Sequence, residues 1–206
     1  AMTEPVNIVF FHLSVSGTEE PVRPLQIGAI DSWGHSEFDA YVWPEREPEE
    51  GSGFHTVGDE LYRDWHDEPL PCLGLEEALI AFLEWLAEVE GSVVLVAHGC
   101  HRSQARVLLR NLEEFQIPYD EVICGFTDSA VASQKLFPMA VDHGLEGMLR
   151  QLELDGECVG DAVEQAEDCR RVCRQLAHHC RMKFLHFVLD EDWSVGTSQQ
   201  WEWAFE

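Results

Sequence analysis

Hydrophobic and polar positions along the first part of the chain predict strands. Apolar runs at residues 6–13 and 25–30 are typical of buried strands. Residues 36–43 carry Phe38, Ala40 and Val42 at every second position, as a half-buried antiparallel strand requires. We therefore expect the chain to begin with a meander of three strands. Residues 54–71 show no clear period, and no element is predicted there.

The remainder of the chain predicts helices that alternate with strands. Apolar residues at three- and four-residue spacing predict a helix over residues 75–86, and the apolar run that follows it at 93–97 predicts a strand buried on both faces. The further predicted elements are a helix at 103–115, a strand at 121–126, and helices at 128–136, 143–152 and 161–180. This order predicts an α/β fold with a mixed sheet flanked by helices.

The charge of the chain bears on its partners. The 206 residues include 13 Lys and Arg against 39 Asp and Glu, a formal net charge of −26, while 45% hydrophobic residues suffice for a core. Such a chain repels phosphate backbones unless its basic residues gather on one face. Nucleic acid is therefore disfavoured as a partner.

Cysteine usage and apolar runs indicate the compartment. Seven scattered cysteines do not resemble a disulfide framework and fit a reducing environment. The longest apolar runs fall far short of the roughly 18 residues of a membrane helix, and the N-terminus lacks the pattern of a signal peptide. We expect an intracellular protein, cytoplasmic or nuclear, without a membrane partner.

Six segments occur in the order found in one enzyme family. Residues 9–18 have the sequence Val-Phe-Phe-His-Leu-Ser-Val-Ser-Gly-Thr, where that family has a strand ending Phe-Phe-Asp-Leu-Glu-x-Thr-Gly. The other segments are 25–30, 54–60, 95–104, 126–138 and 156–162. In these segments the chain resembles the DEDDh 3′–5′ exonucleases. The resemblance implies a ribonuclease H-like mixed β-sheet flanked by helices, with residues 1–183 as the exonuclease-like domain.

The resemblance also implies that catalytic residues are lost. These enzymes hydrolyse phosphodiesters with two divalent metal ions held by several carboxylates, and a histidine accepts the proton of the attacking water. The matching positions here hold His12, Ser14, Gln104 (Ser103 if the alignment shifts by one), Gly156 and a retained Asp161. One carboxylate cannot hold two Mg²⁺ ions, and glycine cannot accept a proton. We expect no cofactor, and Mg²⁺ or Mn²⁺ only if a rearranged site is active.

Two groups of His and Cys leave a zinc site open as an alternative. The first group comprises His12, Cys100, His101 and Asp161, which would bind zinc at the place where the family binds its metal ions. The other comprises Cys169, Cys173, His178, His179 and Cys180. The competing interpretation is core packing, because small and apolar residues recur at helical spacing at Ala162, Ala166, Cys169, Cys173, Leu176 and Cys180. For this second group we favour core packing.

Eight of the 13 basic residues gather in two places. Arg102, Arg106 and Arg110 recur every fourth residue and would form a ridge on one helix face, where they would bind phosphate or an acidic partner. The second set comprises Arg170, Arg171, Arg174, Arg181 and Lys183. We favour the alternative that these side chains pair with the surrounding acids.

The last part of the chain, residues 184–206, is predicted to be an acidic, aromatic-rich extension. Three of the seven Trp lie in its last 14 residues, and such side chains either anchor interfaces or cover the domain's own core. We therefore predict an inactive exonuclease-like domain kept for interaction with a protein partner or for homodimerisation. Two alternatives stay open: binding of RNA or single-stranded DNA through Arg102, Arg106 and Arg110, and a metal-dependent 3′–5′ exonuclease with a rearranged site built on His12, His98 or His101 with Asp161.

Overall fold

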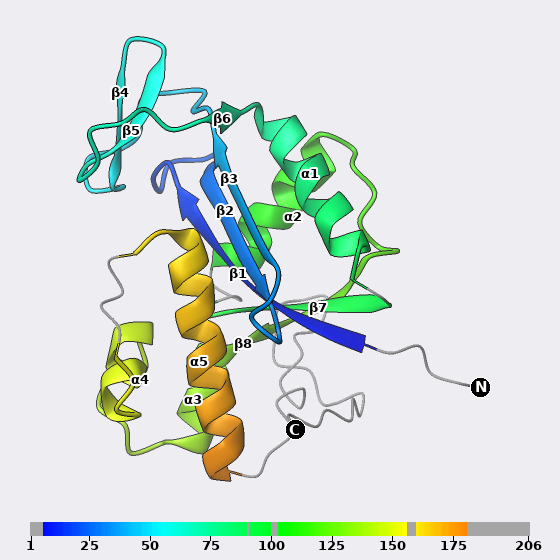
Figure 1. The fold of residues 1–206 in the computed structure, drawn as a ribbon, viewed down its shortest axis with the longest axis vertical. Coiled ribbons are helices and arrows are strands. Elements are labelled where there is room, and N and C mark those ends of the chain that lie inside the picture. The colour runs from blue at the N-terminus through cyan, green and yellow to red at the C-terminus, as the bar shows by residue number, and fades with distance from the viewer. Residues whose placement is uncertain (1–5, 90, 100–102, 156–159, 181–206) are drawn as a thin grey trace.

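A six-stranded mixed sheet forms the centre of the molecule (Figure 1). The structure, a computed structural model, describes residues 6–89, 91–99, 103–155 and 160–180. The strands of the main sheet, in their spatial order, are β6 (Cys72–Leu73), β3 (Glu37–Val42), β2 (Pro24–Asp31), β1 (Val6–Val15), β7 (Ser92–Ala97) and β8 (Ile123–Asp128). The helices are α1 (Leu75–Ala87), α2 (Ala105–Glu114), α3 (Ser129–Leu136), α4 (Leu145–Gln151) and α5 (Ala162–Cys180).

The strand pairing confirms the predicted meander and the mixed sheet. Strand β2 runs antiparallel to both β1 and β3, whereas β7 runs parallel to β1 and β8 runs parallel to β7. Parallel neighbours need a crossover connection. Here α1 lies in the connection that leads to β7, and α2 lies between β7 and β8.

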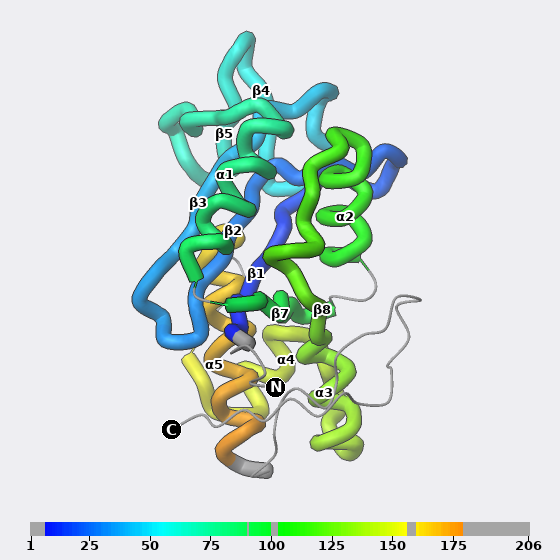
Figure 2. The backbone as a smooth tube through the Cα atoms, turned by 90° about the vertical axis from the view of Figure 1, so that its right-hand side faces the viewer, coloured from blue at the N-terminus to red at the C-terminus, as the bar shows by residue number. Residues whose placement is uncertain are grey.

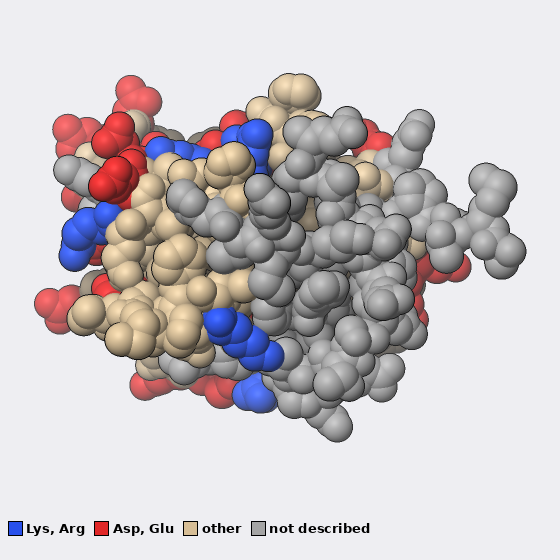
Figure 3. Space-filling model, turned by 90° about the horizontal axis from the view of Figure 1, so that it is seen from below, with Lys and Arg blue, Asp and Glu red and all other residues tan. Residues whose placement is uncertain are grey.

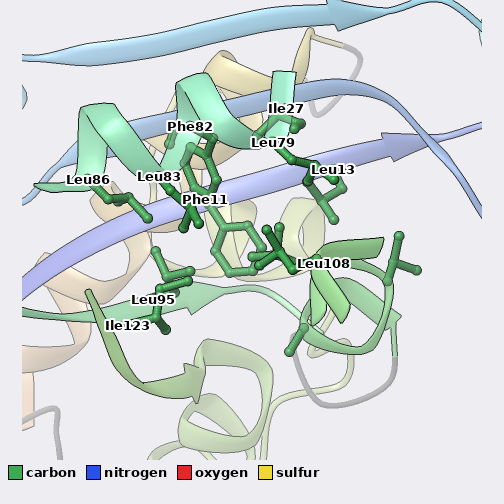
Figure 4. Close-up of a cluster of buried hydrophobic side chains, with 14 of the residues drawn as sticks. Phe11, Leu13, Ile27, Leu79, Phe82, Leu83, Leu86, Leu95, Leu108 and Ile123 are labelled. Carbon is green, nitrogen blue, oxygen red and sulfur yellow. The ribbon is translucent and has the colours of Figure 1, made fainter. Parts of the chain in front are cut away.

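Helices cover both faces of the sheet, as Figure 2 shows from the side. On β1, Phe11 and Leu13 face α1 and α2, where they meet side chains such as Phe82 and Leu108 (Figure 4). The alternate residue Phe10 packs instead with residues of α4 and α5. Because the middle of β1 is buried on both sides, residues 8–11 are a continuous apolar run.

A close contact at Gly28 places the start of α5 on the sheet. A Cβ at position 28 would lie 2.3 Å from the carbonyl carbon of Ala162, so only glycine lets the helix approach β2 this closely. Gly28 is also the cross-strand partner of His12 in β1. The first residues of α5 therefore lie one strand away from His12.

The region without a clear hydrophobic period contains a hairpin that the sequence analysis missed. Strands β4 (Phe54–Val57) and β5 (Glu60–Arg63) form a separate two-stranded sheet, seen at the top of Figure 1. The two-residue turn between them begins at Gly58, whose φ of 61° lies in the left-handed region. Arg63 holds the hairpin to the domain, because its buried guanidinium lies over the rings of Tyr41 and Phe54 and donates to Gln26.

Candidate functional site

His12 and Ser14 lie on the face of β1 that α5 covers. Even-numbered residues of this strand point toward α5, as Phe10 does, so the pleat places His12 and Ser14 on that side. Burial, with a smaller contribution from His98, lowers the pKa of His12 to about 4. His12 is therefore neutral at pH 7. Neither it nor Ser14 supplies the negative charge that a hard divalent cation requires.

Gln104 is bound to the same segment of β1. Its side chain is buried just before α2, where its Oε1 accepts from the Leu13 amide at 2.6 Å and its Nε2 donates to the Leu13 carbonyl at 3.4 Å. Strand β7 pairs with β1 only as far as Phe10, so the side chain of Gln104 takes the place of a neighbouring strand at Leu13. A carboxylate could accept from the amide but could not donate to the carbonyl.

Asp161 closes the first turn of α5. Its carboxylate accepts from the Glu164 amide at 2.9 Å, and the Glu164 carboxylate accepts from the Asp161 amide at 2.9 Å. This reciprocal pair is a capping box, which satisfies two amides that the helix leaves without partners. Asp161, which the resemblance predicts to be a retained acid, therefore has a structural role in its own helix.

The structure brings His12, Ser14, Gln104 and Asp161 to one region, where β1, the start of α2 and the start of α5 meet. Gly156, at the position of the family's general base, lies outside the described residues, as do Cys100 and His101. Within the described ranges, no group of three or more His, Cys, Asp or Glu side chains could hold a metal ion. The four matched residues His12, Ser14, Gln104 and Asp161, with one carboxylate among them, do not fit a pair of Mg²⁺ or Mn²⁺ ions.

His98, at the end of β7, belongs to a buried hydrogen-bond network. Its Nε2 lies 2.7 Å from the His143 carbonyl, its Nδ1 lies 2.8 Å from the Ser129 hydroxyl, and that hydroxyl lies 3.3 Å from the thiol of Cys169. Burial lowers the pKa of His98. Because a carbonyl only accepts, the neutral ring carries its proton on Nε2 and accepts from Ser129 through Nδ1. Both ring nitrogens are thus committed to structural hydrogen bonds.

Two cysteines of the predicted second metal group are core residues. Cys169 and Cys173 are buried and pack with Val172 and Leu176 of the same helix, as the interpretation as core packing expects. Burial raises the pKa of the Cys173 thiol well above its ordinary value. His178 is exposed. The side chains of His179 and Cys180 lie outside the described residues.

Several of the gathered basic residues pair with acids. Arg110 forms a salt bridge with Glu20, and the same holds on α5 for Arg170 with Glu167 and Arg171 with Asp168. Arg102, Arg181 and Lys183 lie outside the described residues. On the face shown in Figure 3, Lys and Arg occupy separate positions instead of one continuous patch.

A cavity of about 310 Å³ opens beside Gln104. The polar side chains that line it are those of Thr18, Glu20, Ser103, Gln104, Arg106 and Arg110. The four-residue spacing of the arginines predicted Arg106 and Arg110 on one face, whereas no sequence pattern indicated that Thr18 and Glu20 would lie beside them. The loop that carries these two residues follows β1, so only the fold brings it against α2.

A second groove, of about 600 Å³, is acidic and was not predicted. It lies between β3 and the first half of α5, and its lining includes Glu37, Asp39, Asp161, Glu164, Glu167 and Asp168. Burial is the main cause that raises the pKa of Asp39, and the nearby charge of Asp161 raises it further. The hydrogen bond that Asp39 accepts from Gln26 lowers this pKa and offsets part of the increase. The groove therefore gathers like charges at close range.

Comparison with solved structures identifies the fold as that of the DEDDh exonucleases. The nuclease domain of 3′hExo, a DEDDh family member bound to rAMP, is 15% identical and superposes with a TM-score of 0.59 over 90% of this chain and 96% of that one. Exonuclease I is 13% identical, with a TM-score of 0.58 over 84% of this chain. E. coli exonuclease I with a 5cy-dA13 oligonucleotide is 15% identical, with a TM-score of 0.54 over 86% of this chain. This chain spans only 41% of exonuclease I.

These similarities confirm the predicted fold. The chain has a DEDDh exonuclease-like, ribonuclease H-like architecture, although identities of this size establish the fold alone. No protein-family profile matches the sequence. No curated protein matches it either. Among the helices that the structure describes, none is long and apolar enough to cross a membrane.

Proposed function

We propose that this chain is a catalytically inactive exonuclease-like domain that serves as a protein-interaction or dimerisation module. The observation that carries this proposal is the pair of hydrogen bonds between Gln104 and the main chain of Leu13. The resemblance matches Gln104, or Ser103 if the alignment shifts by one, to a metal-binding carboxylate of the family. Gln104 serves here as a structural link. A buried side-chain amide whose oxygen and nitrogen both form hydrogen bonds to the main chain is available neither for proton transfer nor for metal binding.

The charges around this link support the same conclusion. Two divalent ions bring four positive charges, whereas among the positions that the resemblance matches to metal ligands His12 is neutral, Ser14 and Gln104 carry no charge, and Asp161 supplies one negative charge. The acids that line the groove with Asp161 form no group that could hold a metal ion within the described part of the chain. Asp161 also holds its own helix through Glu164. The net charge of −26 further disfavours a nucleic-acid substrate.

An assay of metal-dependent nucleotide release tests the proposal. Purified protein is incubated with end-labelled single-stranded DNA or RNA in Mg²⁺, Mn²⁺ or Zn²⁺, alongside Asp161→Asn and, as a matched control, Asp67→Asn at an exposed loop position. We expect no release above the level of a metal-free reaction. Release that Asp161→Asn abolishes and Asp67→Asn preserves would overturn the proposal in favour of a rearranged exonuclease.

A second candidate function is nucleic-acid binding without cleavage. The cavity beside Gln104 carries the guanidinium group of Arg106 and the hydroxyls of Thr18 and Ser103, groups that suit a phosphate. Arg110 also lines it, and a phosphate there would compete with Glu20 for this guanidinium. The neighbouring structures include one with rAMP and one with an oligonucleotide. Arg102, the third residue of the predicted ridge, lies outside the described residues.

Salt dependence and charge reversal test this second candidate. Binding of labelled single-stranded RNA or DNA would weaken steeply with salt and would be lost in Arg106→Glu/Arg110→Glu. Lys135→Glu/Arg150→Glu, at exposed positions of α3 and α4, makes the same change in net charge and is the matched control. Absence of binding at low salt, or equal binding by both variants, would exclude this function.

A further inference from the structure

Strand β3 has an open outer edge. Its inner side pairs with β2 over Glu37–Tyr41, whereas on its outer side β6 pairs only with Tyr41 and Val42. Within the described part of the chain, no strand pairs with the outer side of residues 37–40. Figures 1 and 2 show β3 at this border of the main sheet.

The register determines which main-chain groups point outward. The amide of Trp43 donates to the Leu73 carbonyl of β6 at 2.9 Å, so its N–H points to the outer side. Main-chain groups alternate along a strand, which directs the N–H and C=O of Glu37 and Asp39 outward as well. The open edge thus presents two donors and two acceptors for an added strand.

The two faces beside this edge differ in character. The side chains of Glu37 and Asp39 belong to the acidic groove shared with the first half of α5. On the opposite face Phe38 is half-buried, with its ring centroid 5.9 Å from that of Trp85 on α1. Ile80 of the same helix is 40% exposed. A strand added here would meet carboxylates on one face and apolar side chains on the other.

We infer that the outer edge of β3 binds an extended, Lys- and Arg-rich segment of a partner protein, which adds to the main sheet as a further strand. The inference rests on the proposed function as an interaction module and names the chemistry of the partner. Basic residues at alternate positions would face the groove, and apolar residues between them would face Phe38 and Trp85. Main-chain hydrogen bonds then supply affinity, while the two faces supply specificity.

Charge complementarity favours this occupant over the two nearest alternatives. A second copy of the chain, joined edge to edge, would set Glu37 and Asp39 against the same acids, and like charges on facing strands are destabilising. The chain's own residues 184–206 carry five Asp and Glu and no Lys or Arg, so the groove repels them. Asp161, Glu164 and Asp39 instead provide a concentration of negative charge for cationic side chains, which Arg63 offsets only in part at Asp39.

Fluorescence anisotropy with the whole chain tests the inference. The probe is a labelled peptide of alternating Lys and Val, and its matched control has the same sequence with N-methyl groups on those amides that an added strand would use. We expect the N-methylated peptide to bind at least about tenfold more weakly, because it keeps the charge but cannot form the ladder. An alternating Glu and Val peptide should not bind.

Charge-reversal variants locate the site. Glu37→Lys/Asp39→Lys should weaken binding of the Lys and Val peptide at least about tenfold. The matched pair Asp120→Lys/Glu121→Lys makes the same charge change just before β8, at the other border of the sheet, and should change binding less than about twofold. Thermal unfolding followed by circular dichroism verifies that both pairs fold.

Three outcomes would overturn the inference. These are equal binding of the two Lys and Val peptides, equal weakening by the two variant pairs, and a dimer of the chain that Glu37→Lys/Asp39→Lys dissociates. The nuclease assay separates this result from the proposed function. If the protein neither binds the peptide nor shows nuclease activity, the inference is overturned and the proposed function stands. If the protein shows nuclease activity, the proposed function is overturned whether or not the peptide binds.

Discussion

Gln104 and Leu13, 91 residues apart in the sequence, are joined by two hydrogen bonds between the side-chain amide of one and the main chain of the other. The link closes the side of β1 that β7 leaves open beyond Phe10. The proposed loss of catalysis rests on this link, because the resemblance matches Gln104, or Ser103 if the alignment shifts by one, to a metal-binding carboxylate of the family. The side chain of Gln104 joins the start of α2 to β1.

Replacement of Gln104 by Glu should destabilise the protein. A carboxylate loses the bond to the Leu13 carbonyl and places a charge in a buried position, so we expect the free energy of unfolding to fall by about 1–3 kcal/mol. Urea denaturation measures this value. The control is Gln116→Glu, at an exposed position after α2. Equal losses in both variants would contradict a structural role for Gln104.

Replacement of Asp161 by Ala should reveal a helix cap. Loss of the bond to the Glu164 amide should lower the free energy of unfolding by about 1 kcal/mol. Bound Mg²⁺ or Mn²⁺ would stabilise the folded protein and raise its melting temperature. Since we expect neither ion to bind, their addition should leave the melting temperature of the unsubstituted protein unchanged. A metal-dependent rise in melting temperature that Asp161→Ala removes would assign Asp161 to a metal site instead.

His12 should make stability depend on pH below neutrality. Its pKa is about 4 in the folded protein against about 6.5 in an unfolded chain, so the unfolded state binds more protons between these values. Stability should therefore fall as the pH decreases from about 6.5 to 4, and His12 should contribute up to about 3 kcal/mol of this loss. Urea denaturation at each pH, compared with His12→Gln, isolates this contribution. Parallel pH profiles of the two proteins would contradict it.

Gly28→Ala should disturb the contact between α5 and β2. The added Cβ would lie 2.3 Å from a main-chain carbon of Ala162, and neither the strand nor the helix can move away without loss of packing. We expect a loss of at least about 1–3 kcal/mol in the free energy of unfolding. Gly74→Ala is the control, since a Cβ there meets no atom within 4 Å and the backbone φ of −64° suits alanine. Equal stability of the two variants would show that α5 approaches β2 less closely.

The local sequence predicted strands and helices correctly wherever burial produced a simple repeat of hydrophobic positions. Residues 8–11 of β1 are all apolar because both faces are buried there, and Phe38, Ala40 and Val42 alternate because one face of β3 meets α1. The hairpin of β4 and β5 lacked such a period, although Gly58-Asp59 is a typical two-residue hairpin turn. Its anchor, Arg63, is buried through rings on other segments, which no local pattern displays.

The sequence by itself determined the order of the central strands and helices, the large negative charge, and the absence of carboxylates at His12, Ser14 and Gln104. Only the tertiary structure decided what the replacing residues do. It showed the bonds of Gln104 to Leu13, the cap formed by Asp161, and the acidic groove beside the open edge of β3. The physical reason is that hydrogen bonds and charges act over a few ångströms in space, between residues that chain folding alone brings together.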